Sequence, residues 1–147
     1  MTQDRKPTIL WVDSTFYDKL HHVMAYEDEL SSGGFAICKI PHPDEALDIL
    51  EKNEKKFACI ILEIRLPYGT RFTRAETEEG YRTGIILGRK IRQYDEYKDV
   101  PIVMLTAYPW IFEIIKECKK EFKCFIKADI SPEKFLDEIT KLVGGRG

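Results

Sequence analysis

Four polar side chains of chemically useful types each follow a short apolar run of the sequence. Asp13 follows the first run, Glu63 the third, Thr106 the fourth and Lys127 the fifth. Two carboxylates can share a hard divalent cation such as Mg²⁺, because this ion prefers oxygen ligands. A hydroxyl and an ammonium group beside them can hold a phosphoryl group or fix one carboxylate conformation. We therefore predict that these four residues form one site.

The apolar runs that precede these residues are the predicted strands that position them. They cover Thr8–Val12, Phe35–Ile40, Phe57–Leu62, Val100–Leu105 and Cys124–Ile126. The runs are continuously apolar rather than alternating, which is typical of a parallel sheet covered by helices on both faces. In such a sheet the functional groups gather beyond the carboxyl ends of the strands. The strand pattern thus predicts that the four polar residues share one edge.

Amphipathic stretches between the runs predict helices. They cover residues 15–32, 43–52, 84–94, 110–122 and 131–143, with Gly33 and Gly34 as a helix stop and Pro43 and Pro132 at helix starts. Five strands alternating with five helices, joined by right-handed crossovers, predict a doubly wound α/β fold. We expect one domain over residues 7–144, with an extended loop at 68–83 and a tail at 145–147.

Composition narrows the classes of protein to consider. The chain has 147 residues, is 44% hydrophobic and carries a formal net charge of −2. That content of apolar residues excludes disorder as the main state, and near-zero charge disfavours a general nucleic-acid binder. We see no signal peptide and no apolar stretch of the ~20 residues that a membrane helix needs, so we expect a cytoplasmic protein without a membrane anchor. The four cysteines form no CxxC pair, and we expect them to be reduced core thiols.

The chain resembles the receiver domain of response regulators in two-component signalling, over about residues 7–143. The segments that carry the resemblance are ILWVDS (9–14), FACIILEIRLP (57–67), GIILGRKIR (84–92), VPIVMLTA (100–107) and CFIKADI (124–130). The resemblance implies a flavodoxin-like fold that accepts a phosphoryl group on an aspartate at the end of the third strand, with the help of Mg²⁺. It also implies an output surface made by the fourth helix, the fifth strand and the fifth helix.

Some of the family's site residues match this chain. Asp13 matches the first of the paired acidic residues, Thr106 the hydroxyl that follows the phosphoryl group, and Lys127 the invariant lysine. The resemblance implies that Asp13, the residue at position 63 and the backbone carbonyl of Arg65 hold the metal ion.

Two departures fall on the phosphorylation chemistry itself. Ser14 stands where the second acidic residue belongs, which removes one carboxylate from the metal shell, and Glu63 stands at the phospho-acceptor position. A side chain that is longer by one methylene displaces the attacking oxygen by over an ångström, and small misplacements cost ~10²-fold in rate. We therefore expect any Mg²⁺ binding to be weak or absent, and phosphotransfer to be inefficient. Glu63 can instead reach Lys127 or Thr106 and hold the domain in one state, with a constitutively active-like state as one option.

This interpretation makes the protein a binding module of a phosphorelay rather than an enzyme. Its expected partners are signalling proteins: a histidine kinase, a phosphotransfer protein or an effector. A homodimer through the fourth helix, fifth strand and fifth helix is a further option. The candidate partner-binding residues are the aromatic side chains Trp110, Phe112 and Phe125; from sequence alone, core and interface roles remain open for them.

Two other functions remain to be considered. The first is a Mg²⁺-dependent receiver that still performs phosphotransfer, with Asp13 and Glu63 as ligands. The second is a nucleotide- or flavin-binding flavodoxin relative, which is disfavoured because no glycine-rich loop follows the first strand. The long segment 68–83 leaves from the same edge and is either a lid or docking element or a solvated excursion, with a short helical turn predicted at 73–80.

Overall fold

Five parallel strands form one sheet in the order β2-β1-β3-β4-β5 in the computed structural model, which describes residues 6–16, 23–107 and 112–144. The strands are β1 (Thr8–Val12), β2 (Ala36–Ile40), β3 (Cys59–Leu62), β4 (Ile102–Thr106) and β5 (Lys123–Ile126). Strand order reverses between β1 and β3, where a doubly wound sheet has its switch point. The pairing of Val12 with Leu62 makes the next residues of both strands neighbours at this point.

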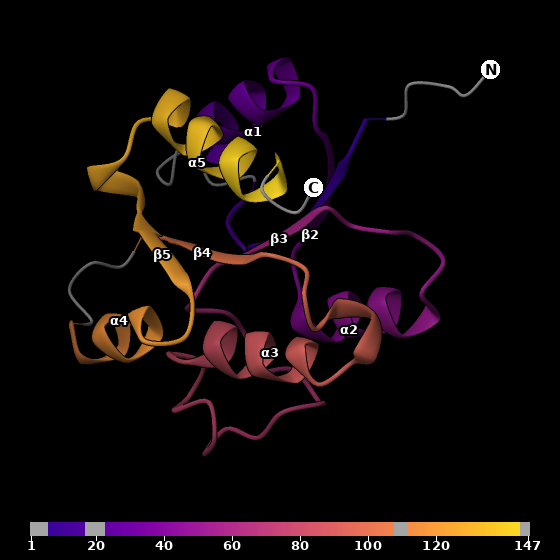
Figure 1. Cartoon of the computed structure of the whole chain (residues 1–147). Coiled ribbons are helices and arrows are strands. Elements are labelled where there is room, and N and C mark those ends of the chain that lie inside the picture. The colour runs from indigo at the N-terminus through magenta and orange to yellow at the C-terminus, as the bar shows by residue number, and fades with distance from the viewer. Residues whose placement is uncertain (1–5, 17–22, 108–111, 145–147) are drawn as a thin grey trace.

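Helices cover both faces of the sheet. The helices are α1 (Val23–Ser32), α2 (Pro43–Lys52), α3 (Thr83–Arg92), α4 (Phe112–Lys119) and α5 (Pro132–Gly144), with 3₁₀ helices η2 (Asp95–Tyr97) and η3 (Lys127–Asp129) between them. Figure 1 shows α1 and α5 together above the sheet and α2, α3 and α4 below it. The predicted flavodoxin-like fold of five parallel strands and five helices is thereby confirmed.

Two apolar layers fill the space between the sheet and its helices. One layer joins Trp11, Ile61 and Leu105 to Phe135 of α5. Alternate strand residues point to the opposite layer, which packs against α2, α3 and α4. Every residue of β3 and β4 is buried, as the continuous apolar runs predict.

The first helix begins later than predicted. Residues 15–32 were expected to be helical, but Ser14, Thr15 and Phe16 form a turn, and the described part of the helix starts at Val23. The Asp13 carboxylate accepts hydrogen bonds from the backbone N–H of Thr15 at 2.8 Å and from its hydroxyl at 2.5 Å. An aspartate that bonds the backbone two residues on favours a turn over a helix, and this accounts for the difference.

The other predicted boundaries agree with the structure to within a few residues. β1 has the predicted bounds, and α2 begins at Pro43, where His42 accepts a hydrogen bond from the Asp44 N–H. The predicted tail 145–147 and residues 110–111 lie outside the described residues. Within the part of the chain that the structure describes, no helix has the length and apolar character to cross a membrane.

Candidate functional site

The carboxyl ends of the strands bring the four predicted polar residues together. Asp13, Glu63 and Thr106 are fully buried, and the Lys127 side chain is 7% exposed. The Lys127 Nζ lies 3.0 Å from Asp13 Oδ2 and 3.7 Å from Glu63 Oε2. A single ammonium group therefore faces two buried carboxyl groups.

The Glu63 side chain is held by donors from two neighbouring strand ends. Its Oε1 accepts a hydrogen bond from the Ile64 N–H at 2.7 Å, and its Oε2 accepts one from the Ala107 N–H at 3.1 Å. The Thr106 hydroxyl also hydrogen-bonds this carboxyl group. Burial raises the pKa of Glu63 to about 7, against the opposing effect of the Lys127 ammonium. Glu63 thus changes its charge near neutral pH while remaining inside the protein.

The backbone beside Glu63 is packed against the start of α3. The Gly84 N–H donates a hydrogen bond to the Ile64 carbonyl at 2.8 Å. A Cβ atom at Gly84 would lie 2.1 Å from the Glu63 carbonyl oxygen and 2.7 Å from the Ile64 Cα. Because both neighbours are backbone atoms, only glycine fits this approach, and α3 thereby fixes the backbone that carries Glu63.

Tyr26 of α1 holds the segment that carries Lys127. Its hydroxyl lies 2.7 Å from the Lys127 carbonyl oxygen and 2.6 Å from the Ile130 carbonyl oxygen. The Tyr26 ring packs edge-on against Phe135, with ring centroids 5.7 Å apart. The sequence analysis missed Tyr26, because nothing local to it signals a contact with a residue 101 positions away.

The carboxylate oxygens of this site already accept hydrogen bonds from the protein itself. Both oxygens of Asp13 accept hydrogen bonds, from Thr15 and from Lys127, and both oxygens of Glu63 accept backbone N–H groups. Ser14 adds no carboxylate. Among the residues that the structure describes, no group of three or more His, Cys, Asp or Glu side chains gathers to hold a metal ion.

A small pocket lies next to the site on the side of Ser14 and Arg65. It has a volume of about 370 Å³ and is also lined by Leu66, Pro67, Glu79 and Gly80. The Arg65 guanidinium lies over the ring of Tyr81, 4.7 Å from its centroid. The long segment 68–83 therefore supplies part of the wall beside the predicted site.

The segment 68–83 is tied to the helices on either side of it. Asp44 of α2 accepts hydrogen bonds from the Thr70 N–H and hydroxyl, both at 2.9 Å, and from the Arg71 N–H at 3.2 Å. At the other end, Arg82 pairs with Glu117 of α4. Both ends of the segment are therefore attached to the domain, although most of its residues are exposed, and its role as a lid or docking element stays a prediction.

A capping box organises the middle of this segment. The Thr73 hydroxyl accepts the Glu76 N–H at 3.0 Å, and the Glu76 carboxylate accepts the Thr73 N–H at 2.7 Å. Backbone hydrogen bonds from Thr77 to Thr73 and from Glu79 to Arg74 follow. The predicted helical turn at 73–80 is shorter than expected: it covers Thr73–Thr77, and the positive φ values of Glu78, Glu79 and Gly80 end it there.

The described candidate partner-binding residues differ in their exposure. Phe112 at the start of α4 is 77% exposed. Phe125 is half-buried and packs against Phe135, with ring centroids 5.6 Å apart. Trp110 lies outside the described residues. Only Phe112 therefore offers a largely free aromatic surface among the described members of this set.

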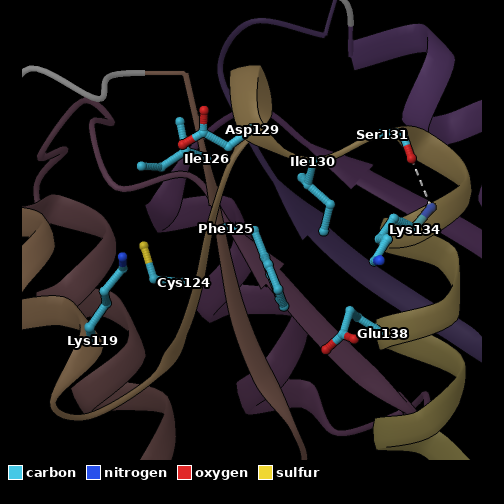
Figure 2. A pocket seen from close by; sticks show the side chains of 9 residues that line it. All are labelled: Lys119, Cys124, Phe125, Ile126, Asp129, Ile130, Ser131, Lys134 and Glu138. Atoms are coloured by element: carbon cyan, nitrogen blue, oxygen red, sulfur yellow. Dashed lines mark hydrogen bonds between the residues drawn. The ribbon is translucent and has the colours of Figure 1, made fainter.

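A pocket of about 620 Å³ opens at the edge strand β5, between α4 and α5. Its lining residues are Lys119, Cys124, Phe125, Ile126, Asp129, Ile130, Ser131, Lys134 and Glu138. Figure 2 shows Cys124 and Lys119 on one side of β5 and Phe125 on the other, toward α5. The predicted output face therefore combines a hollow with charges of both signs.

Comparison with known proteins identifies the fold. No family model and no curated protein matches the chain. Among solved structures, it is similar to the chemotaxis response regulator CheY4 of Vibrio cholerae, at 19% identity and TM-score 0.65, over 93% of this chain and 98% of that one. It is also similar to a CheY-like response regulator receiver domain protein of Methanospirillum hungatei, at 16% identity and TM-score 0.68, over 96% of each chain.

A third similar structure is the receiver domain of a sensor histidine kinase of Pseudomonas aeruginosa, described with a magnesium ion coordinated in its active-site cleft. It shares 18% identity and a TM-score of 0.68, over 95% of this chain and 98% of that one. TM-scores of 0.65 to 0.68, with nearly complete coverage of both chains, establish a shared fold. The chain has the CheY-like fold of response-regulator receiver domains.

Proposed function

We propose that this protein is a receiver-like signalling module that acts by binding other proteins and does not depend on phosphorylation. The observation that carries the proposal is the position of Glu63. Its carboxyl group is fully buried and is bonded by the Thr106 hydroxyl and the Ala107 N–H, with Lys127 3.7 Å away. Donors that would stabilise a phosphoryl group in a receiver fold already serve a side chain of the protein itself.

The same contacts oppose phosphotransfer to Glu63. Attack on a phosphoryl donor needs an ionised and reachable carboxylate oxygen, with charge neutralisation around the transferred group. Glu63 is fully buried, and its pKa of about 7 leaves a large neutral fraction at physiological pH. With Ser14 in place of a second acidic residue, the site also lacks a carboxylate that would attract Mg²⁺. Geometry, charge and metal binding are thus all unfavourable for this step.

The docking surface that we propose is the face formed by α4, β5 and α5. Phe112 supplies an exposed aromatic side chain, and the pocket beside Phe125 supplies a hollow. Aromatic side chains are enriched where proteins bind each other. A histidine kinase, a phosphotransfer protein, an effector or a second copy of this chain would dock here, and a Phe112→Ala variant should lose partner binding while keeping its stability.

The proposal is tested by incubation with acetyl phosphate and Mg²⁺, followed by intact-mass measurement under conditions that preserve acyl phosphates. We expect no phosphorylated species in the wild-type protein. Stoichiometric, hydroxylamine-sensitive phosphorylation would overturn the proposal and favour the Mg²⁺-dependent receiver.

Two variants serve as matched controls for this experiment. Glu63→Asp shortens the acceptor, and Ser14→Asp restores the second acidic position. We expect labelling in the double variant, since it regains both the acceptor geometry and the metal-binding carboxylate. Labelling of Ser14→Asp alone to the same extent would mean that Glu63 is a competent acceptor, which contradicts the proposal.

A further inference from the structure

Two cysteines that are six positions apart in sequence meet between α4 and β5. Cys118 is fully buried on α4, and Cys124 on β5 is half-buried and packs against the core layer that contains Cys118. Cys124 lies opposite Met104 of β4, and both pack in the apolar layer that contains Cys118, where the two thiols interact. The turn between them is closed by hydrogen bonds from the Glu121 and Phe122 N–H groups to the Cys118 carbonyl, at 3.0 and 2.9 Å. The turn thereby brings the two sulfur atoms together without a CxxC pattern.

The two thiols have different environments. Cys124 lines the 620 Å³ pocket at the edge strand, so small solutes can reach it, whereas Cys118 is sealed in the core. The neighbouring Cys118 thiol, together with the Lys119 ammonium, holds the pKa of Cys124 below its usual range despite partial burial. Figure 2 shows the Cys124 thiol and the Lys119 amino group on the same side of β5. An accessible thiol beside a cation and a second thiol has the features of an oxidation-sensitive cysteine.

We propose that Cys118 and Cys124 form a peroxide-sensitive dithiol that closes to an intramolecular disulfide. The Cys124 thiolate attacks one oxygen of a hydroperoxide, which forms an S–O bond, breaks the O–O bond and releases hydroxide or an alkoxide. The Cys118 sulfur then attacks the Cys124 sulfur, which forms the S–S bond and expels the hydroxyl group as water with the Cys118 proton. The two thiols lose two electrons and two protons in total, and the peroxide is reduced to water, or to water and an alcohol.

The geometry favours this pairing over any other among the four cysteines of the chain. A disulfide requires Cα atoms within about 7 Å and side chains that point toward each other. Two thiols that interact within one apolar layer need only small movements to meet this. Cys38 and Cys59 belong to opposite core layers, so their side chains leave the sheet on different faces. This inference does not depend on the proposed function, because neither thiol belongs to the site around Glu63.

The test treats the fully reduced, full-length protein with one equivalent of hydrogen peroxide and then blocks the remaining thiols under denaturing conditions. We expect a mass lower by two hydrogen atoms before blocking, and only two of the four thiols available to the blocking reagent. Trypsin should release peptide 117–119 linked to peptide 124–127, and a reductant should separate them. Retention of all four thiols, or oxidation confined to Cys38 or to links between molecules, would overturn the proposal.

Three single variants assign the roles of the two sulfurs. In Cys118→Ala we expect a sulfenic acid at Cys124 that dimedone traps, and in Cys124→Ser we expect no rapid oxidation at Cys118. Cys38→Ser is the matched control, since it removes another half-buried thiol. In this variant the Cys118–Cys124 disulfide should form as in the wild type. If Cys118→Ala does not fold, Cys124→Ser still decides the matter: unchanged rapid loss of two thiols in that variant would contradict the assignment.

Discussion

The Nζ of Lys127 lies 3.0 Å from Oδ2 of Asp13, closer than the 3.7 Å that separates it from Oε2 of Glu63. The cation is therefore bonded directly to Asp13 and acts on Glu63 mainly through its charge. One ammonium cannot fully compensate two buried carboxylates, because each ion loses its hydration on burial. The raised pKa of Glu63 follows from this burial, and it makes the charge of the site depend on pH.

Glu63→Gln should remove a pH-dependent contribution to stability. The pKa of Glu63 is about 7 in the folded protein and 4.5 in the reference state, so the folded form binds the proton more tightly. Below pH 4.5 both states are protonated; as pH rises from 4.5 to 7 the unfolded state ionises first, and stability is lost. The free energy of unfolding of the wild type should therefore fall by on the order of 3 kcal/mol relative to that of Glu63→Gln as the pH rises from 4.5 to 7.

Urea unfolding of both proteins at several pH values measures this difference. The comparison cancels the other titrating groups, which the two proteins share. A difference in the free energy of unfolding that stays constant from pH 4.5 to 8 would show that Glu63 ionises as it does in water.

Lys127→Met should destabilise the protein by about 3–5 kcal/mol at pH 8, because it leaves two buried carboxyl groups without their cation. The loss should be smaller at pH 5, where Glu63 is neutral in the folded protein. Lys141→Met is the matched control: Lys141 is 77% exposed and lies 3.8 Å from Glu138, so its removal should change stability by less than about 1 kcal/mol. Equal effects of the two substitutions in thermal and urea unfolding would argue against a buried charge cluster.

Tyr26→Phe should cost about 1–2 kcal/mol, since the carbonyls of Lys127 and Ile130 lose a buried hydrogen-bond donor. Hydrogen exchange should become faster for amides of residues 127–130 in particular. Tyr81→Phe, at a more exposed position, should change stability little. Faster exchange spread evenly over the chain in Tyr26→Phe would indicate general destabilisation instead of a positioning role.

Asp44→Ala should release one end of the segment 68–83. The Asp44 carboxylate accepts three hydrogen bonds from Thr70 and Arg71, and losing roughly 1.4 kcal/mol of local stability would raise the open population about tenfold. Limited proteolysis with trypsin should show faster cleavage after Arg71 and Arg74. Glu45→Ala removes another acidic residue from the first turn of α2 and should leave the cleavage rate unchanged.

Much of the sheet and the placement of four site residues could be predicted from the sequence. Continuous apolar runs are a strong signal for buried parallel strands, and the end of each run marks the edge where polar groups gather. Asp13, Glu63, Thr106 and Lys127 were found in this way. The turn at Thr15 was not predicted. The Asp13 carboxylate competes with the helix for backbone N–H groups, and the spacing of apolar residues does not report this competition.

The sequence pattern does not predict contacts between distant segments. The bonds from Asp44 to Thr70 join residues 26 positions apart, and the segment 68–83 therefore looked unanchored. Tyr26 reads as one more aromatic residue on a helix. The pairing of Cys118 with Cys124 depends on a tight turn whose closure follows from tertiary packing and not from cysteine spacing.

The amide resonance of Ala107 provides the most direct test of the central claim, that Glu63 occupies the position of a phosphoryl group. The Ala107 N–H already donates to Glu63 Oε2 at 3.1 Å. In ¹H–¹⁵N spectra recorded before and after addition of Mg²⁺ and acetyl phosphate, we predict an unchanged Ala107 resonance. A new Ala107 resonance, appearing together with shifts at Thr106 and Lys127, would contradict the account.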